Sequence, residues 1–211
     1  MMQEKVKDFG QLATETQIQN TLEALKKNGV EGIVVNTGSK ALKRIKELIP
    51  EGASVMNGSS VTLETIGFVD YLKSGSHSWN NLHGAIVKET EREKQKEARR
   101  ESLTSDYYLG SVHALTEEGE FLVASNTGSQ LPHIAFSSPN VILVVGSQKI
   151  VPTLEDAMAR LKDYVVPLED KHMRQKYGVG TNLSKILIFR KEVPMNQRTI
   201  RMVLVKEKLG F

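Results

Sequence analysis

Short runs of β-branched and aliphatic residues, separated by segments with helical spacing, are the feature that most constrains the fold of this chain. Such runs occupy residues 32–35, 53–56 and 141–145. A strand that is apolar at nearly every position must be covered on both faces, which is typical of parallel sheets. The segments between the runs supply the crossovers that parallel strands need. The sequence therefore predicts an α/β fold, with a largely parallel sheet covered by helices on both faces.

The helical segments have recognisable boundaries. Residues 1–28 are amphipathic and predict an N-terminal helical extension that ends at Asn28-Gly29. Two more helices are expected over 41–49 and 61–72. A later helix starts at Thr153, and Pro167 is expected to break or kink it.

Strands are also expected in the second half of the chain. Residues 107–123 predict two strands joined by a turn at Glu117-Glu118-Gly119, which would form a β-hairpin inserted into the fold. Residues 186–189 and 202–205 predict terminal strands. Between the halves, residues 88–101 alternate in charge, which favours a solvated helix over a nucleic-acid-binding arm.

Composition limits the class of protein. A chain of 211 residues that is 39% hydrophobic and 25% charged predicts one globular domain over residues 1–211. It has no cysteine, which excludes disulfides, iron–sulfur clusters and cysteine nucleophiles, and suits a cytoplasmic location. The first ten residues are charged, unlike a secretory signal, and no apolar run approaches a membrane span. The net charge of +3 comes without a clustered basic face, so we expect neither a nucleic-acid nor a membrane partner.

Four loops rich in glycine and hydroxyl side chains follow predicted strands. Glycine lets the backbone approach a ligand closely, and free amides at a helix start attract anions. The carboxyl ends of parallel strands share one sheet edge, where ligands of α/β proteins bind, so we expect the loops to converge. The sequence predicts that one pocket binds a small carboxylate- or phosphate-bearing anion through Gly38, Ser39, Gly58, Ser59, Ser60, Asn126, Gly128, Ser129, Gly146 and Lys149. Taken singly, each loop is better explained by turn and capping chemistry, and it is the four together that favour a shared pocket.

Several charged residues have both a functional and a structural interpretation. Glu64 is a candidate base or ligand anchor, or a carboxylate near a helix start. Glu117 is a candidate for acid/base chemistry, or part of an exposed turn. Lys149 could neutralise an anion or be solvated, and His133 could line the pocket or make a structural hydrogen bond. The five histidines lack metal-ligand spacing and no nucleotide-binding fingerprint occurs, so no metal and no cofactor is expected.

Several motifs together resemble the LUD (lactate utilisation) family. One is the hairpin at 111–125, with an acidic residue, any residue and then glycine before an apolar strand. The others are Leu131-Pro132-His133-Ile134, the block 144–152 and the helix start 57–67. Glu118 and Glu120 stand where many members of the family have threonine beside the hairpin glycine.

The resemblance implies a fold like that of sugar-phosphate isomerases, CoA transferases and folate cyclo-ligases (NagB/RpiA/CoA transferase-like), and a link to bacterial lactate oxidation. It favours Glu117, Gly119, Glu64, Ser59, Ser60 and Lys149 as site residues. Without cysteine clusters, the chain cannot be the iron–sulfur subunit of such a system.

We therefore expect a non-redox protein that binds a small anion and supports lactate or organic-acid utilisation, with catalysis left open. One alternative is a non-catalytic assembly subunit with iron–sulfur partners, and another is a transferase or cyclo-ligase-like enzyme. A homo-oligomer is compatible with each of these.

Overall fold

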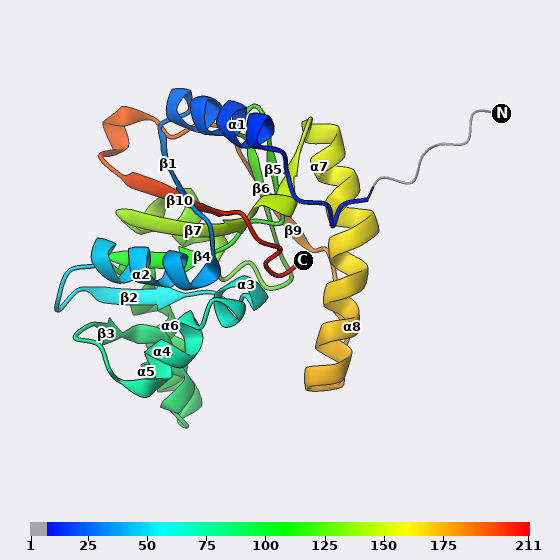
Figure 1. The fold of residues 1–211 in the computed structure, drawn as a ribbon. Coiled ribbons are helices and arrows are strands. Elements are labelled where there is room, and N and C mark those ends of the chain that lie inside the picture. Colours follow the sequence, from blue (N-terminus) through cyan, green and yellow to red (C-terminus); the bar gives the residue numbers. More distant parts are fainter. Residues whose placement is uncertain (1–7) are drawn as a thin grey trace.

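Six parallel strands form the main sheet of the structure, a computed structural model that describes residues 8–211 (Figure 1). Their order across the sheet is β1-β10-β7-β4-β2-β3. The central strand β7 pairs with β10 on one side and with β4 on the other. The strands are β1 (Val30–Val35), β2 (Ser54–Asn57), β3 (Asn80–Asn81), β4 (Tyr107–Gly110), β7 (Asn140–Gly146) and β10 (Thr199–Val205).

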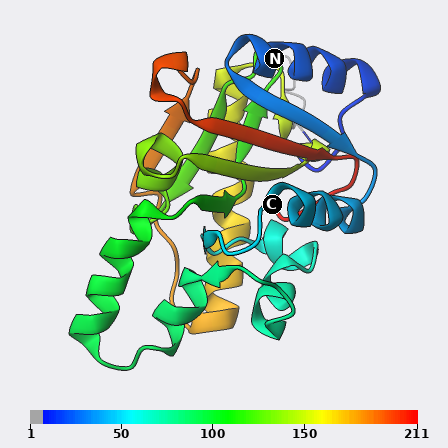
Figure 2. The same cartoon turned by 90° about the vertical axis from the view of Figure 1, so that its left-hand side faces the viewer.

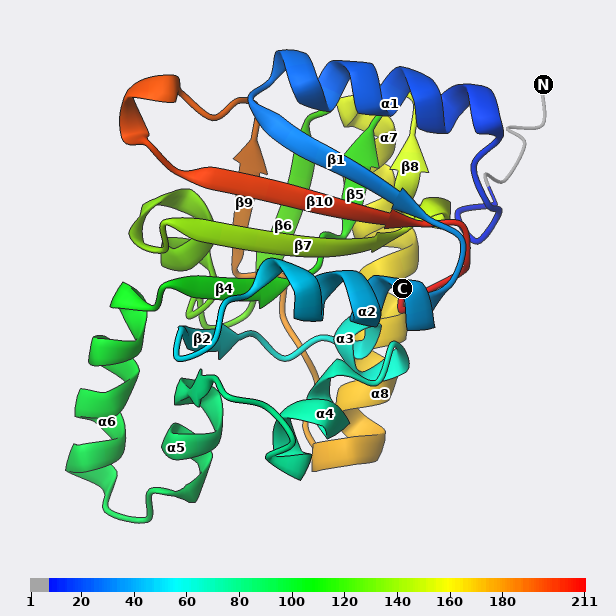
Figure 3. The same ribbon diagram turned by 60° about the vertical axis from the view of Figure 1, so that its left-hand side comes forward.

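A second, mixed sheet of four strands packs against one face of the first (Figure 3). Its order is β8-β5-β6-β9, with β5 parallel to β8 and the other two pairs antiparallel. The strands are β5 (Ala114–Thr116), β6 (Phe121–Ser125), β8 (Ile150–Val151) and β9 (Lys185–Phe189).

Helices surround the two sheets. They are α1 (Glu15–Lys27), α2 (Gly38–Leu48), α3 (Val61–Thr65), α4 (Phe68–Ser74), α5 (Leu82–Lys88), α6 (Arg92–Glu101), α7 (Leu154–Arg160) and α8 (Val166–Tyr177). A π-helical turn, Leu161–Val165, joins α7 to α8. Short 3-10 turns occupy Ser102–Thr104, Ser147–Lys149 and Pro194–Asn196, and a second π-helical turn occupies His133–Ser137. None of the helices in residues 8–211 is long and apolar enough to cross a membrane.

Three apolar clusters account for the layers. Helices α2, α3 and α4 cover one face of the main sheet. Helix α1 and the second sheet cover its other face, where Phe121 and Phe189 stack beneath β7 and β10. The α7 helix and the π-helical turn after it cover the outer face of the second sheet. The predicted α/β fold with a parallel sheet is confirmed.

Local chemistry explains the helix boundaries. Thr14 caps α1 through a reciprocal capping box with Gln17, so within the predicted extension 1–28 the described helix begins at Glu15. Residues 1–7 of that extension lie outside the described residues. The single helix predicted over 61–72 is wrong, because Gly67 adopts a φ of 79° and divides it into α3 and α4.

Two further predictions need correction. Residues 107–123 form three strands, because Tyr107–Gly110 joins the parallel sheet as β4 and only β5 and β6 form the hairpin. Pro167 does not end its helix: α8 continues directly from the π-helical turn Leu161–Val165, and Pro167 lies in the first turn of α8, where proline is tolerated. The charged segment 88–101 contains α6, which has no buried residue and projects from the body beside α5 (Figure 2).

Candidate functional site

A cavity of about 670 Å³ lies between the carboxyl edge of the main sheet, the loop after β6 and the helix α8. This volume is within the range of small-molecule binding sites. The loops after β2 and β4 and the turn after β7 form one wall, as expected for neighbouring parallel strands that end at the same edge. Of the predicted site residues, this cavity brings together Gly58, Ser59, Ser60, Asn126, Ser129 and Lys149.

Lys149 is the buried cation of this cavity. Its Nζ atom donates hydrogen bonds to Thr62 Oγ1 at 3.0 Å, to Ser111 Oγ at 3.1 Å and to the Val112 carbonyl at 3.1 Å. Among residues 8–211, no carboxylate forms an ion pair with it. Burial, with a smaller contribution from the charge of Arg160, lowers the pKa of Lys149 to about 7. A lysine placed this way favours an incoming negative charge.

His113 lies beside Lys149 on the same wall. Its Nδ1 atom accepts a hydrogen bond from the backbone N–H of Ala124 at 3.1 Å, which assigns the proton of the neutral ring to Nε2. Burial, and then the charges of Lys149 and Arg160, lower the pKa of His113 to about 3. The ring is therefore a neutral donor at physiological pH rather than a second cation.

Arg160 is fully buried behind this wall. Its guanidinium donates to the carbonyl oxygens of His113 and Phe9, and its carbon lies 5.2 Å from the centre of the Tyr164 ring. The charge of Arg160 adds to the positive potential around His113 and Lys149. The inner end of the cavity is consequently cationic.

The loop after β2 approaches the sheet closely. A Cβ atom at Gly58 would lie 2.5 Å from the Tyr108 hydroxyl and 3.2 Å from Gln130 Oε1, so only glycine fits there. Ser60 caps α3 by accepting a hydrogen bond from the Leu63 N–H. The loop is thus held against Tyr108 and Gln130, with Ser59 and Ser60 on the cavity wall.

Helix α8 forms the opposite wall, with no fully buried residue of its own. Glu169, His172 and Met173 line the cavity from this helix. Burial raises the pKa of Glu169, which makes it a candidate proton acceptor or donor facing the cationic wall. Glu64, a predicted catalytic residue, instead forms an ion pair with Lys176 at 3.0 Å and tethers α3 to α8.

Three predicted residues lie outside the cavity, and two of them, Gly38 and Gly146, lie against the C-terminal tail. Glu207 accepts a hydrogen bond from the Gly38 N–H at 2.8 Å, and Ser39 contacts the hydroxyl of Thr37. At Gly146, an added Cβ would collide with the backbone of residues 207 and 209. The tail that follows β10 thus covers the ends of β1 and β7, so the four glycine loops do not share one pocket.

The hairpin turn also lies away from the cavity. Glu117 accepts a hydrogen bond from Gln17 of α1 at 2.9 Å. Gly119 has a φ of 80°, and a Cβ there would lie 2.9 Å from the backbone of Ala24. This turn fastens α1 to the second sheet. Gly128 packs against Lys185 beside the cavity, behind Ser129.

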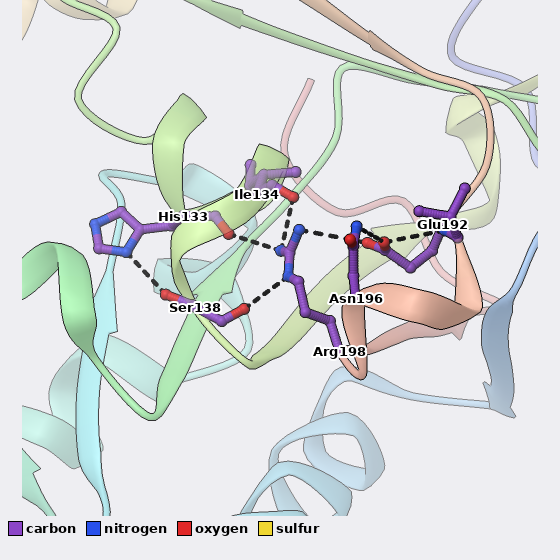
Figure 4. A network of polar contacts seen from close by, with 7 residues as sticks. His133, Ile134, Ser138, Glu192, Asn196 and Arg198 are labelled. Atoms are coloured by element: carbon purple, nitrogen blue, oxygen red, sulfur yellow. Dashed lines mark hydrogen bonds and ion pairs between the residues drawn. The ribbon is translucent and has the colours of Figure 1, made fainter.

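His133 belongs to a buried network that ties the π-helical turn to β10 (Figure 4). Its Nδ1 atom lies 3.0 Å from Ser138 Oγ, and its ring stacks on Tyr108. Arg198 donates to the carbonyl oxygens of residues 133, 134 and 138, and forms a buried ion pair with Glu192 at 3.3 Å. Burial lowers the pKa of His133 to about 4, and its role in this network is structural.

Sequence reasoning missed the loop after β4 and the wall formed by α8. The expected hairpin over 107–123 includes Ser111 and His113, which hides the fact that they follow a parallel strand. The signal is the run Tyr107–Gly110, which ends in glycine as β7 does. Within residues 8–211 no group of three or more His, Cys, Asp or Glu side chains is arranged to hold a metal ion.

Comparisons with known proteins agree with the fold. A family model described as the LUD domain matches residues 18–205. The solved structure of a DUF162 family protein from Deinococcus radiodurans has a similar fold, with a TM-score of 0.53 and 11% sequence identity. The likeness covers 92% of this chain and 98% of that one. None of the curated proteins compared with the chain matches it.

Proposed function

Because the chain belongs to the LUD domain family, we propose that it binds a carboxylate- or phosphate-bearing anion in the cavity beside α8, in support of lactate or related organic-acid utilisation. The family resemblance supplies the metabolic context. The cavity supplies the chemistry, through the residues that line it rather than through the glycine loops beneath the C-terminal tail.

The observation that carries the proposal is Lys149. A buried cation without a counter-charge is costly, and proteins retain such groups where a ligand completes them. Its three hydrogen bonds run to acceptors, so they hold the ammonium form in place. Ser111 and Thr62 also line the cavity, and their hydroxyl groups donate to the carbonyl oxygens of Val144 at 2.7 Å and Leu209 at 3.3 Å, which leaves their oxygen lone pairs to accept from Lys149.

Glu169 is the residue that would act as the acid or base if a proton is transferred in this cavity. It is a carboxyl group on the cavity wall, and its raised pKa suits proton transfer. Glu117 and Glu64, the residues favoured by the sequence, are engaged with Gln17 and Lys176. Binding is the core of the proposal, and turnover is a separate question that Glu169→Gln addresses.

Thermal-shift and calorimetric titrations with lactate, pyruvate and inorganic phosphate test the proposal. An anion present at 100 times its Kd raises the free energy of unfolding by about 2.7 kcal/mol. We expect this gain for the wild type, weakening as the pH rises above about 7 and Lys149 loses its proton.

Lys149→Met should lose the gain, because the variant keeps an unbranched side chain of similar size and removes the charged amine. Lys43→Met is the matched control, since Lys43 is an exposed lysine of α2 outside the cavity. If no anion stabilises the wild type, the anion-binding proposal is wrong and the assembly-subunit alternative gains support.

A further inference from the structure

The volume of the α8 cavity is far larger than a three-carbon acid requires. Water occupies roughly 30 Å³ per molecule in the liquid, so a cavity of about 670 Å³ has room for about 20 water-sized atoms. Lactate and pyruvate have six non-hydrogen atoms each. Bound alone, either acid would leave most of the cavity filled with solvent, which gives little affinity from burial.

The two walls of the cavity differ in chemistry. The wall at the sheet edge is polar and cationic, with Ser59, Ser60, Thr62, Ser111 and Lys149. The wall formed by the α7–α8 segment and the last loops carries the apolar side chains of the cavity, with Glu169, His172, Thr181 and Asn182 as its polar members. The apolar side chains are Leu161, Val165, Val166, Met173, Leu183 and Phe211. Phe211 is held there by an edge contact with His172, whose ring lies 6.0 Å away.

Packing against the core accounts for part of the apolar wall. Leu161 and Val165 belong to the apolar cluster behind the second sheet and Val166, Leu183 and Phe211 pack against it, whereas Met173 does not. Helix α8 has no fully buried residue, although Val166 and Met173 are partly buried. Both residues line the cavity, so part of their apolar surface borders it. A ligand with an apolar body would cover this surface, and removing it from water would favour binding.

We infer that the ligand is an amphipathic anion: a carboxylate or phosphate head at the Lys149 wall, carrying an apolar chain or ring along α8. This inference rests on the proposed function and narrows it to organic acids that are longer than lactate. The head is recognised by charge and hydroxyl groups, and the body is recognised by burial against Met173, Val166 and Leu183.

Two acids with the same head test the inference. Lactate and 2-hydroxyoctanoate share the 2-hydroxycarboxylate group, and the second adds five methylene groups. Each buried methylene tightens binding roughly fourfold, so burial of three predicts a Kd about 60-fold lower for 2-hydroxyoctanoate. Isothermal titration calorimetry measures both constants on the full chain.

Variants on and off the apolar wall locate the effect. Met173→Ser should reduce the ratio of the two constants to less than about tenfold, because it places a polar group where the chain of the ligand lies. Met195→Ser is the matched control: Met195 is 84% exposed and outside the cavity, and the ratio should be unchanged.

The outcomes separate the inference from the proposed function. If lactate binds and 2-hydroxyoctanoate binds no more tightly, the anion site stands and the amphipathic ligand is wrong. The amphipathic ligand is also wrong if both methionine variants lower the ratio equally. If neither acid nor inorganic phosphate binds, both the proposed function and the amphipathic ligand are wrong.

Discussion

Replacing Lys149 by methionine should change how the stability of the protein depends on pH. In the unfolded chain the ammonium group has a pKa near its ordinary value of 10.5, and in the folded protein burial lowers it to about 7. Between these values the unfolded chain binds a proton that the folded protein does not. The free energy of unfolding of the wild type therefore rises with pH across this window because of Lys149.

The magnitude follows from the two pKa values. The reference is the free energy of unfolding at high pH, where Lys149 is neutral in both the folded and the unfolded chain. Relative to this value, the lowered pKa of Lys149 reduces the free energy of unfolding by about 4 kcal/mol at pH 7 and by about 1 kcal/mol at pH 9.5. The wild type should gain about 3 kcal/mol between these pH values from this one group. Methionine cannot titrate, and the variant should lack the gain.

The lost hydrogen bonds partly offset the benefit of removing the charge. Thr62, Ser111 and the Val112 carbonyl each lose a donor, at about 1 kcal/mol per bond. At pH 7 the net effect on stability is therefore small, within about 1 or 2 kcal/mol, and the pH dependence is the informative quantity.

Urea denaturation of the wild type, Lys149→Met and Lys43→Met at pH 7.0, 8.0, 9.0 and 9.5 measures this difference. Relative to the wild type, the free energy of unfolding of Lys149→Met should fall by about 3 kcal/mol as the pH rises across this range. Lys43→Met should run parallel to the wild type. Parallel curves for the wild type and Lys149→Met would contradict this prediction, because they would mean that Lys149 keeps an ordinary pKa in the folded protein.

Three further predictions concern other residues. Glu169→Gln should stabilise the protein above pH 4.5 and leave its stability unchanged well below that pH, because burial raises the pKa of the carboxyl group and makes its charged form costly. Thermal unfolding at pH 4 and pH 7.5 measures the stability difference between the variant and the wild type. If Glu169 were solvated, that difference would be the same at both pH values. His133→Phe keeps a ring against Tyr108 and removes a group whose pKa falls from 6.5 to about 4. Between pH 6.5 and pH 4 the free energy of unfolding should fall by about 3 kcal/mol less in the variant than in the wild type. An equal fall in both proteins would contradict this. Arg198→Met should destabilise the protein by about 3 to 5 kcal/mol, because Glu192 and three carbonyl oxygens lose their donor; a loss below 1 kcal/mol by urea denaturation would show that the network of Figure 4 is dispensable.

The parallel sheet can be predicted because its strands are apolar at nearly every position, as β7 is between Val141 and Val145. The second sheet cannot be predicted in the same way. Its strand β8 has two residues and β9 follows a long helix, so the sequence does not indicate which strands they pair with. Tyr107–Gly110 is wrongly predicted as part of the hairpin, because a short strand that precedes a hairpin has the same local pattern as a hairpin strand.

The candidate site can be predicted in part for an equally physical reason. Ser59 and Ser60 follow β2, whose edge is open, and they line the cavity. Lys149 reaches the cavity from the turn after β7. Gly38 and Gly146 follow strands of the same sheet, but the tail after β10 closes that part of the edge. Whether an edge is open depends on long-range packing, which no local spacing encodes. The apolar wall of α8 is equally hidden, because Val166 and Met173 share their face of the helix with Glu169, which interrupts the apolar stripe.

Proton uptake on anion binding shows whether the anion binds beside the charged form of Lys149. Lactate and 2-hydroxyoctanoate do not titrate near pH 8, so calorimetry in two buffers of different ionisation enthalpy counts the protons that the protein takes up. At pH 8 Lys149 is about nine-tenths neutral, and an anion beside it restores the ammonium form. We expect the wild type to take up close to one proton, about 0.9 per anion bound, and Lys149→Met to bind no anion. Binding without proton uptake, or with equal affinity in the variant, would contradict this expectation.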